Sequence, residues 1–414
     1  MLDDLISFLD ASPSPWHAVA STIDRLDGFE RVEETDAWDD VPDAGYVVRS
    51  GAVIAWRRPA SAPAHAPFRL VGAHTDSPGL RVKPHPDAGG FGWKQLAVEV
   101  YGGILNNSWL DRDLGIAGRL VGADGESVLV NVAEPVARVP QLAVHLDREV
   151  NSGGLLLDTQ QHLSPVWGVG ASTPGEFADW IGSVADLDTP PSWWELCLYD
   201  VQGASVLGAD GSLLASGRLD NQLSCWAAAT ALADAEPEGH TAVIVLNDHE
   251  EVGSSSSTGA AGPFLDSVLS RLVTARGGST DDRHRSFAAS SCISADNAHA
   301  VHPNYPERHE PGHRPIANAG PALKVNANQR YATSAETAAE FQRACETAGV
   351  PWQVFVSRNN MPCGSTIGPL TATRLGIATV DVGVPQLSMH SARELCGAAD
   401  PVHLTRALGV FLRG

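Results

Sequence analysis

The sequence is poor in positive charge. Its 414 residues include 28 Lys and Arg against 49 Asp and Glu, which gives a formal net charge of −21 at pH 7. Proteins bind nucleic acids and anionic membranes through clustered Lys and Arg, because these release the counterions of the phosphate groups. We therefore expect neither nucleic acid nor a membrane as a partner.

Long apolar runs and paired cysteines are also missing. No apolar stretch approaches the length of a membrane-spanning helix. The acidic N-terminus MLDDLISFLDASPSPW lacks the basic and apolar regions of a secretory signal. The six cysteines are widely spaced, without a CxxC pair or a dense framework. A reduced, cytoplasmic protein is the simplest interpretation.

A usable HExxH zinc motif is absent, although the stretch HEPGH (His309–His313) matches its letters. The motif requires both histidines on one face of an intact helix. Pro311 is tolerated only in the first turn of a helix, which would leave His309 outside it. We expect a loop here and seek metal ligands elsewhere.

The chain, with 43% hydrophobic residues, is long enough for a large core and two domains. Two helices, a hairpin at 45–58 and a buried strand at 68–73 are expected first. From about Arg81 to Ser216, strands and turns alternate with almost no helical periodicity, which indicates an inserted β-rich domain. Helices and strands then alternate to the end. The pattern predicts an α/β fold with a doubly wound, mostly parallel sheet, divided into residues 1–82 and 216–414 and an insert at 83–215.

Polar side chains follow the expected strands of this sheet. Ligands bind beyond the carboxyl ends of the strands in open α/β sheets. A lone histidine or carboxylate there is more often structural, but co-occurrence favours one metal site. Two imidazoles and three carboxylates suit a pair of divalent ions, zinc, manganese or cobalt. The polar residues at these strand ends are His74, Asp76, Glu250, Glu251, Asp296 and His390. Asp220 lies just before an expected helix.

The adjacent glutamates follow the apolar strand TAVIVLN. Because neighbours on a regular strand point to opposite faces, the two are expected to have different roles. One would bind metal, while the other, Glu250, takes the proton of an attacking water. Asp76 lies two residues after His74 and is expected to orient its ring through the second nitrogen.

Seven segments form an ordered set of motifs along the chain: VGAHTDSPGLRVKP, SGRLDNQLSCWAA, NDHEEVGSSS, ISADNAHAVHPNYPERHEP, GPALKVNANQRYAT, MPCGSTIGP and PQLSMHS. This set resembles the aspartyl aminopeptidase family of cocatalytic zinc exopeptidases. The similarity extends from the N-terminal helices to the C-terminus.

The resemblance implies that Asp220 bridges two metals, with His74 and Asp296 completing one site and Glu251 and His390 the other. Glu250 is then the general base and Asp76 the partner of His74. It also implies a zinc-exopeptidase fold in which 1–82 and 216–414 form the proteolytic domain. The insert becomes a dimerisation domain within a tetrahedral dodecamer.

Substrate recognition is also implied by the resemblance. His145 matches a histidine that reaches a neighbouring subunit's active site. Lys324 and the loop of Met361, Gly364 and Ser365 are candidate substrate contacts, each with a structural role as the alternative. His249 stands where the family's NEEVGS-type motif has a more ordinary polar residue.

The expected activity is removal of an N-terminal residue, preferably Asp or Glu, from peptides. The alternatives are an aminopeptidase that prefers neutral or hydrophobic N-terminal residues, and a di-metal deacylase or carboxypeptidase. A serine hydrolase is disfavoured, since neither Ser365 nor the run Ser254–Ser257 has the G-x-S-x-G spacing. A non-catalytic assembly protein would be expected to lose ligands that are all present here.

Overall fold

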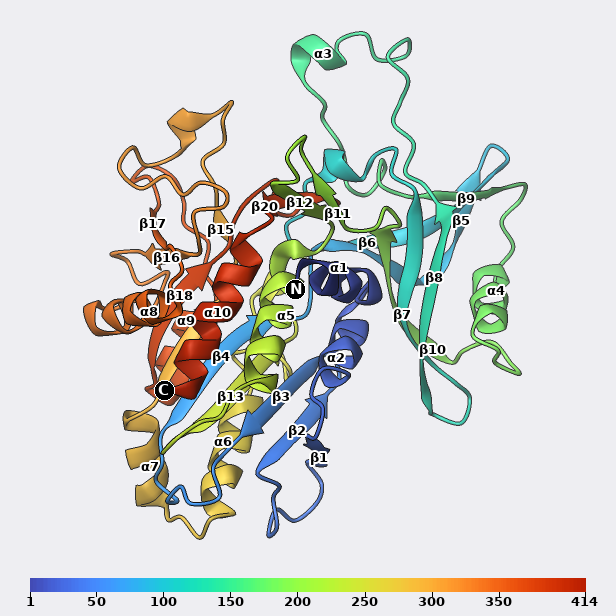
Figure 1. The fold of residues 1–414 in the computed structure, drawn as a ribbon. Helices are drawn as coiled ribbons and strands as arrows, with labels where there is room; N and C mark the ends of the chain where they lie inside the picture. Colours follow the sequence, from blue (N-terminus) through green and yellow to red (C-terminus); the bar gives the residue numbers. More distant parts are fainter.

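A computed structural model describes residues 1–414. Figure 1 shows a large sheet flanked by helices, with a second sheet beside it. None of the helices combines the length and apolar character needed to cross a membrane.

The large sheet has nine strands and is mixed, with a parallel centre. Its four central strands, β13, β4, β14 and β18, run parallel to one another. In spatial order the strands are β1 (Glu30–Arg31), β2 (Ala44–Arg49), β3 (Ala52–Arg57), β13 (Thr241–Asn247), β4 (Phe68–His74), β14 (Ser291–Ala295), β18 (Ala378–Gly383), β16 (Ala322–Val325) and β17 (Gln353–Val356).

Both faces of this sheet are covered, as a doubly wound fold requires. In β13, Ile244 and Leu246 belong to one core cluster, while Val243 and Val245 belong to another on the opposite face. The first cluster includes residues of α1 (Leu2–Ala11), α2 (Pro15–Ile23), α5 (Leu219–Ala233), α8 (Ala335–Ala348) and α10 (Asp400–Arg413). The other face packs against α6 (Phe264–Thr274), α7 (Thr280–Ala288) and α9 (Ile367–Leu375).

The second sheet has its own core and lies between the two halves of the large sheet in the sequence. Its strands are β8 (Ser127–Ala137), β7 (Leu114–Val121), β10 (Trp193–Asp200), β5 (Gly79–Gly90), β6 (Trp93–Tyr101) and β9 (Val166–Val169). A segment containing the short helix α3 (Val150–Gly153) projects from this part of the chain (Figure 1). In the sequence, the first strand of the second sheet is β5, which begins at Gly79. The boundaries 83–215 and a dimerisation role stay predictions.

A third, five-stranded sheet joins short strands from distant parts of the chain. They are β11 (Ser205–Leu207), β12 (Leu213–Ser216), β20 (Glu394–Gly397), β19 (Pro385–Leu387) and β15 (Ala298–His299). Three short 3₁₀ helices are η1 (Asn106–Trp109), η2 (Glu250–Val252) and η3 (Pro306–Arg308). Because η3 ends before His309, the HEPGH stretch is a loop, as its proline predicts.

Between Arg81 and Ser216, where almost no helical periodicity was expected, the structure has the short helices η1 and α3 and one longer helix. Helix α4 (Glu176–Val184) packs Phe177 and Ile181 into the core of the second sheet. Its apolar residues Phe177, Trp180, Ile181 and Val184 recur at i, i+3, i+4 and i+7, so the sequence does carry a helical signal here. The first turn of α4 is capped by Asp87, a residue distant in the sequence. The backbone N–H groups of Gly175 and Phe177 donate to the Asp87 carboxylate at 2.7 and 3.0 Å.

Candidate metal centre

The carboxyl ends of three neighbouring strands meet at one edge of the large sheet. Strands β13, β4 and β14 are parallel, so their final residues lie side by side. His74 is the last residue of β4, and Asp296 follows the last residue of β14. Both side chains are buried, with His74 1% exposed. The sheet therefore brings these two predicted ligands together.

Asp220 and His390 reach this edge from other elements. Asp220 lies at the start of α5, where its backbone (φ −83°, ψ 106°) departs from helical geometry. It is held there by its own N–H, which donates to Glu394 at 2.8 Å. His390 follows β19 with a positive φ of 67°, and its N–H donates to the same Glu394 at 2.7 Å. One buried carboxylate thus fixes the backbone at both residues.

Glu250 and Glu251 are not on an extension of β13, contrary to our expectation. The strand ends at Asn247, and His249 adopts a left-handed conformation (φ 62°) that starts the 3₁₀ helix η2. The backbone N–H groups of Glu250 and Glu251 both donate to Asp76, each at 3.1 Å. A turn fixed by Asp76, and not strand alternation, therefore orients the two side chains.

The ligand atoms are spaced as around metal ions. His74 Nε2 lies 3.4 Å from Asp220 Oδ1 and 3.6 Å from Asp296 Oδ1. His390 Nε2 lies 3.5 Å from Asp220 Oδ2 and 3.3 Å from Glu251 Oε2. Tetrahedral zinc with bonds of about 2.0–2.2 Å separates its ligand atoms by roughly 3.3–3.6 Å. The two oxygens of Asp220 face different histidines, Oδ1 facing His74 and Oδ2 facing His390.

Unpartnered oxygens also fit a metal. Asp220 Oδ1 and Glu251 Oε1 are buried without a hydrogen-bond partner, which is costly unless a cation compensates. Three groups could hold an ion: His74 with Asp220 and Asp296, Asp220 with Glu251 and His390, and His74 with Glu250 and Glu251. The residues present therefore fit zinc, although the third group leaves open which glutamate is the ligand.

Burial and neighbouring charges shift the pKa values of three side chains in the site. Burial, and after it the Asp220 carboxylate, raises the pKa of Glu251 well above its ordinary value. Burial also raises the pKa of Glu250 to about 8. Burial alone would lower the pKa of His390, but the Asp220 carboxylate raises it to about 9. Clustered buried carboxylates that resist ionisation are stabilised by positive charge at the same place.

Asp76 contacts the second nitrogen of His74, as expected from its spacing. His74 Nδ1 lies 3.3 Å from the Asp76 carboxylate and 3.0 Å from its backbone oxygen. Asp76 is fully buried. A histidine whose second nitrogen faces a carboxylate has a fixed ring orientation and a more basic ligand nitrogen.

A cavity of about 410 Å³ opens onto the centre. Of the predicted substrate contacts, Lys324, Gly364 and Ser365 line it. Met361 lies outside the lining and is 37% exposed. His145 is on the exposed projecting segment and does not reach the cavity of its own chain.

Six lining residues were not predicted from the sequence: Gly253, Asn297, His299, Tyr331, Thr366 and Met389. His299 has a detectable signal, since it belongs to the stretch that follows the strand ending at Ala295. Met389 directly precedes His390. Tyr331 and Thr366 lie in loops, where neither periodicity nor a strand end marks them.

His249, the residue that departs from the family's pattern, contacts no ligand. Its Nδ1 lies 2.9 Å from Ser256 Oγ and 3.2 Å from Thr258 Oγ1. Its own N–H donates to Asp248 at 2.9 Å. The side chain therefore ties η2 to the serine-rich loop behind it.

Comparison with known proteins gives one consistent family. The profile described as "Aminopeptidase I zinc metalloprotease (M18)" matches residues 8–412. A probable M18 family aminopeptidase 2 of Streptomyces coelicolor is 55% identical over 99% of this chain and 97% of its own length. The relative of the same name from Mycobacterium tuberculosis is 50% identical, over 99% and 97%.

Solved structures agree in fold. A chain of the Ape4 and Nbr1 complex has a TM-score of 0.95 at 33% identity, over 99% of this chain and 85% of that one. The mApe1 dodecamer of S. cerevisiae has a TM-score of 0.86 at 28% identity, over 99% and 95%.

Proposed function

The chain belongs to the M18 family of zinc metallo-aminopeptidases, and we propose that it removes N-terminal Asp or Glu from peptides with two metal ions. The observation that supports two ions is the pair of ligand groups that share Asp220. Membership of an aminopeptidase family disfavours the alternative of a deacylase or carboxypeptidase. A preference for neutral or hydrophobic N-terminal residues remains the second candidate.

In this proposal Asp220, His74 and Asp296 would hold one ion. Asp220, Glu251 and His390 would hold the other. Bound divalent ions would polarise the scissile carbonyl, acidify a water and hold the free α-amine. Zinc fits the mixed nitrogen and oxygen ligands, and manganese or cobalt are possible replacements.

Glu250 is proposed as the general base. It borders the cavity beside the ligand Glu251, and its position is fixed through its backbone N–H by Asp76. Its carboxylate would accept a proton from the attacking water and return it to the leaving amine. Asp76 would keep the ring of His74 oriented and leave Nε2 free for metal.

The acidic preference rests on Lys324. Among the residues that line the cavity, Lys324 is the only Lys or Arg. Its ammonium group donates to the backbone oxygens of Asp296 and Asn297 at 2.8 and 3.0 Å. An ammonium has three protons, so one remains for the carboxylate of a substrate side chain.

Replacing Lys324 by methionine is expected to lower kcat/KM for an N-terminal Asp substrate about 10- to 100-fold, the worth of a charge-assisted hydrogen bond. Rates on a Leu substrate serve as the internal reference, because a general disturbance of the site would lower both. Lys83→Met removes the same charge from β5, away from the cavity, and should leave the Asp-to-Leu ratio unchanged. A wild-type protein that prefers Leu would support the second candidate.

Assembly is proposed by likeness to the solved dodecamer. The projecting segment exposes Leu142, Val144, Leu146 and Leu156 around His145, which suits contact with another copy. His145 would then complete the active site of a neighbouring subunit.

Mixing inactive subunits tests this role. His145→Ala and Glu250→Gln proteins, dissociated and reassembled together, should regain activity, because some sites then combine an intact Glu250 with a neighbour's intact His145. Each protein reassembled alone is the control. Absence of any recovery in verified mixed oligomers would place His145 outside the neighbouring site.

A further inference from the structure

Three consecutive residues at the end of β6 approach the candidate metal centre. Tyr101 is the last residue of β6, and Gly102 and Gly103 follow it. We call Tyr101–Gly103 the YGG segment. It lies far in the sequence from every proposed ligand except His74, so its contacts are tertiary.

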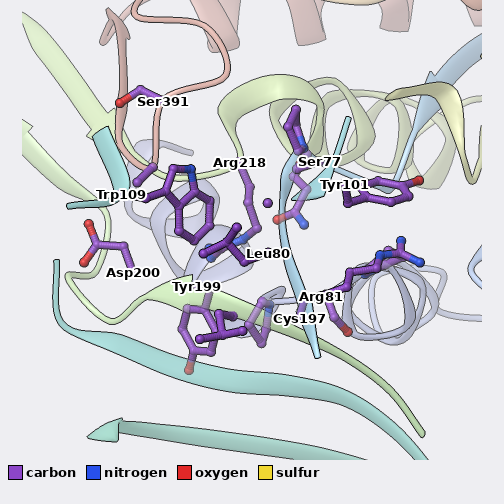
Figure 2. Close-up of a pocket in the computed structure, with 18 of the residues that line it drawn as sticks. Ser77, Leu80, Arg81, Tyr101, Trp109, Cys197, Tyr199, Asp200, Arg218 and Ser391 are labelled. Atoms are coloured by element: carbon purple, nitrogen blue, oxygen red, sulfur yellow. The ribbon is translucent and has the colours of Figure 1, made fainter. Parts of the chain in front are cut away.

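Tyr101 acts on the His74 side through Asp76. Its hydroxyl donates to Asp76 Oδ2 at 2.7 Å, and both groups are buried. Asp76 in turn contacts His74 Nδ1 and accepts the N–H of Glu251. The Arg81 guanidinium stacks on the Tyr101 ring, 3.6 Å from its centroid. Figure 2 shows this ring at the border of a small cavity, with the hydroxyl pointing away from the other labelled residues.

Gly102 and Gly103 contact the ligand group that contains Glu251 and His390. His390 Nδ1 lies 2.9 Å from the backbone oxygen of Gly103, which accepts its proton and leaves Nε2 facing Asp220 and Glu251. Gly102 has a φ of 69°, and a Cβ there would lie 3.1 Å from Glu251 Cβ. The segment therefore passes so close to Glu251 that a glycine fits best.

We propose that the YGG segment positions both halves of the metal centre, so that the second sheet sets metal affinity. The inference rests on the proposed two-ion site. Tyr101 donates to Asp76, which contacts His74, and the backbone oxygen of Gly103 accepts from His390. Gly102 limits the position of Glu251. These are positioning residues, since none of them offers a ligand atom to the ligand groups.

A purely structural role for the same contacts makes a different prediction. If Tyr101 only contributes to packing, losing its hydroxyl should lower the unfolding temperature of metal-free protein and leave metal affinity alone. If it positions Asp76, metal affinity should fall while the metal-free protein unfolds at nearly the same temperature.

Tyr101→Phe keeps the ring and removes only the hydroxyl. We expect zinc affinity, measured by competition with a chelator, to fall about 10- to 100-fold, as for other outer partners of metal ligands. Tyr199→Phe is the matched control, because that hydroxyl donates to Asn131 at 2.6 Å elsewhere in the second sheet. Its zinc affinity should equal that of the wild type.

Gly102→Ala tests the other half. Gly28 has a similar φ of 75°, but a Cβ at Gly28 would meet no atom within 4 Å, so Gly28→Ala carries the backbone strain alone. We expect Gly102→Ala to weaken the ion bound by Glu251 and His390 about tenfold or more, and Gly28→Ala to leave it unchanged.

His74→Ala separates failure of this inference from failure of the metal centre. Zinc affinity lost in His74→Ala but intact in both Tyr101→Phe and Gly102→Ala would overturn only the positioning role. Zinc affinity intact in His74→Ala as well would overturn the metal centre, and the inference with it.

Discussion

Replacing Glu250 by glutamine is expected to lower kcat by about 10²–10⁴-fold, the usual contribution of a general base. The amide has the size of the carboxylate but cannot take a proton from water. Because Glu250 is not among the proposed ligands, metal content should stay nearly unchanged. Steady-state rates on an N-terminal Asp peptide and metal analysis of the same sample measure both quantities.

Glu251→Gln is the matched comparison, because the two glutamates are neighbours on η2 and both donate their backbone N–H to Asp76. This variant should lose metal, since Oε2 of Glu251 lies 3.3 Å from His390 Nε2 and is replaced by an amide nitrogen or oxygen without charge. The pair of variants also decides between the alternative ligand groups. Full activity in Glu250→Gln, or greater metal loss there than in Glu251→Gln, would contradict the assigned roles.

The gathering of the candidate ligands at one edge could be predicted because the sheet is simple at this point. His74 and Asp296 each mark the end of a very apolar strand, and parallel neighbours end at the same edge. Asp220 is found by a different signal, its place just before a helix. Asp220 and Asp296 lie 3.4 and 3.6 Å from His74. These distances depend on the whole fold and could not be predicted from the sequence.

The contacts that position the ligands could not be predicted. Glu394 holds the backbone of Asp220 and His390 from β20, and Tyr101 reaches Asp76 from the second sheet. Glu394 is close in the sequence to His390, but no spacing relates it to Asp220 or relates Tyr101 to Asp76. Glu250 and Glu251 lie at the expected edge of the sheet, but the turn at His249 places them there and not an extension of β13. The positive φ of His249 cannot be predicted from strand periodicity.

Metal removal should abolish activity, and replacing Asp220 by asparagine should reproduce this loss. Its two oxygens face His74 at 3.4 Å and His390 at 3.5 Å, so both proposed ions share it. Asparagine keeps the shape but offers one neutral oxygen and an N–H₂ group in place of the second. Lewis-acid stabilisation amounts to several kcal/mol, so kcat/KM should fall about 10³-fold or more.

Asp296→Asn separates a bridging ligand from a terminal one. Asp296 faces only His74 among the ligand histidines, so this variant should keep the ion of Glu251 and His390. Ions per chain should fall to about one in Asp296→Asn and to near none in Asp220→Asn. Zinc should raise the unfolding temperature of wild-type protein, because an ion bound only to the folded state stabilises it, and should fail to do so for Asp220→Asn. Equal losses in the two variants would mean that Asp220 binds a single ion, and rapid hydrolysis by metal-free protein would remove the ions from the reaction.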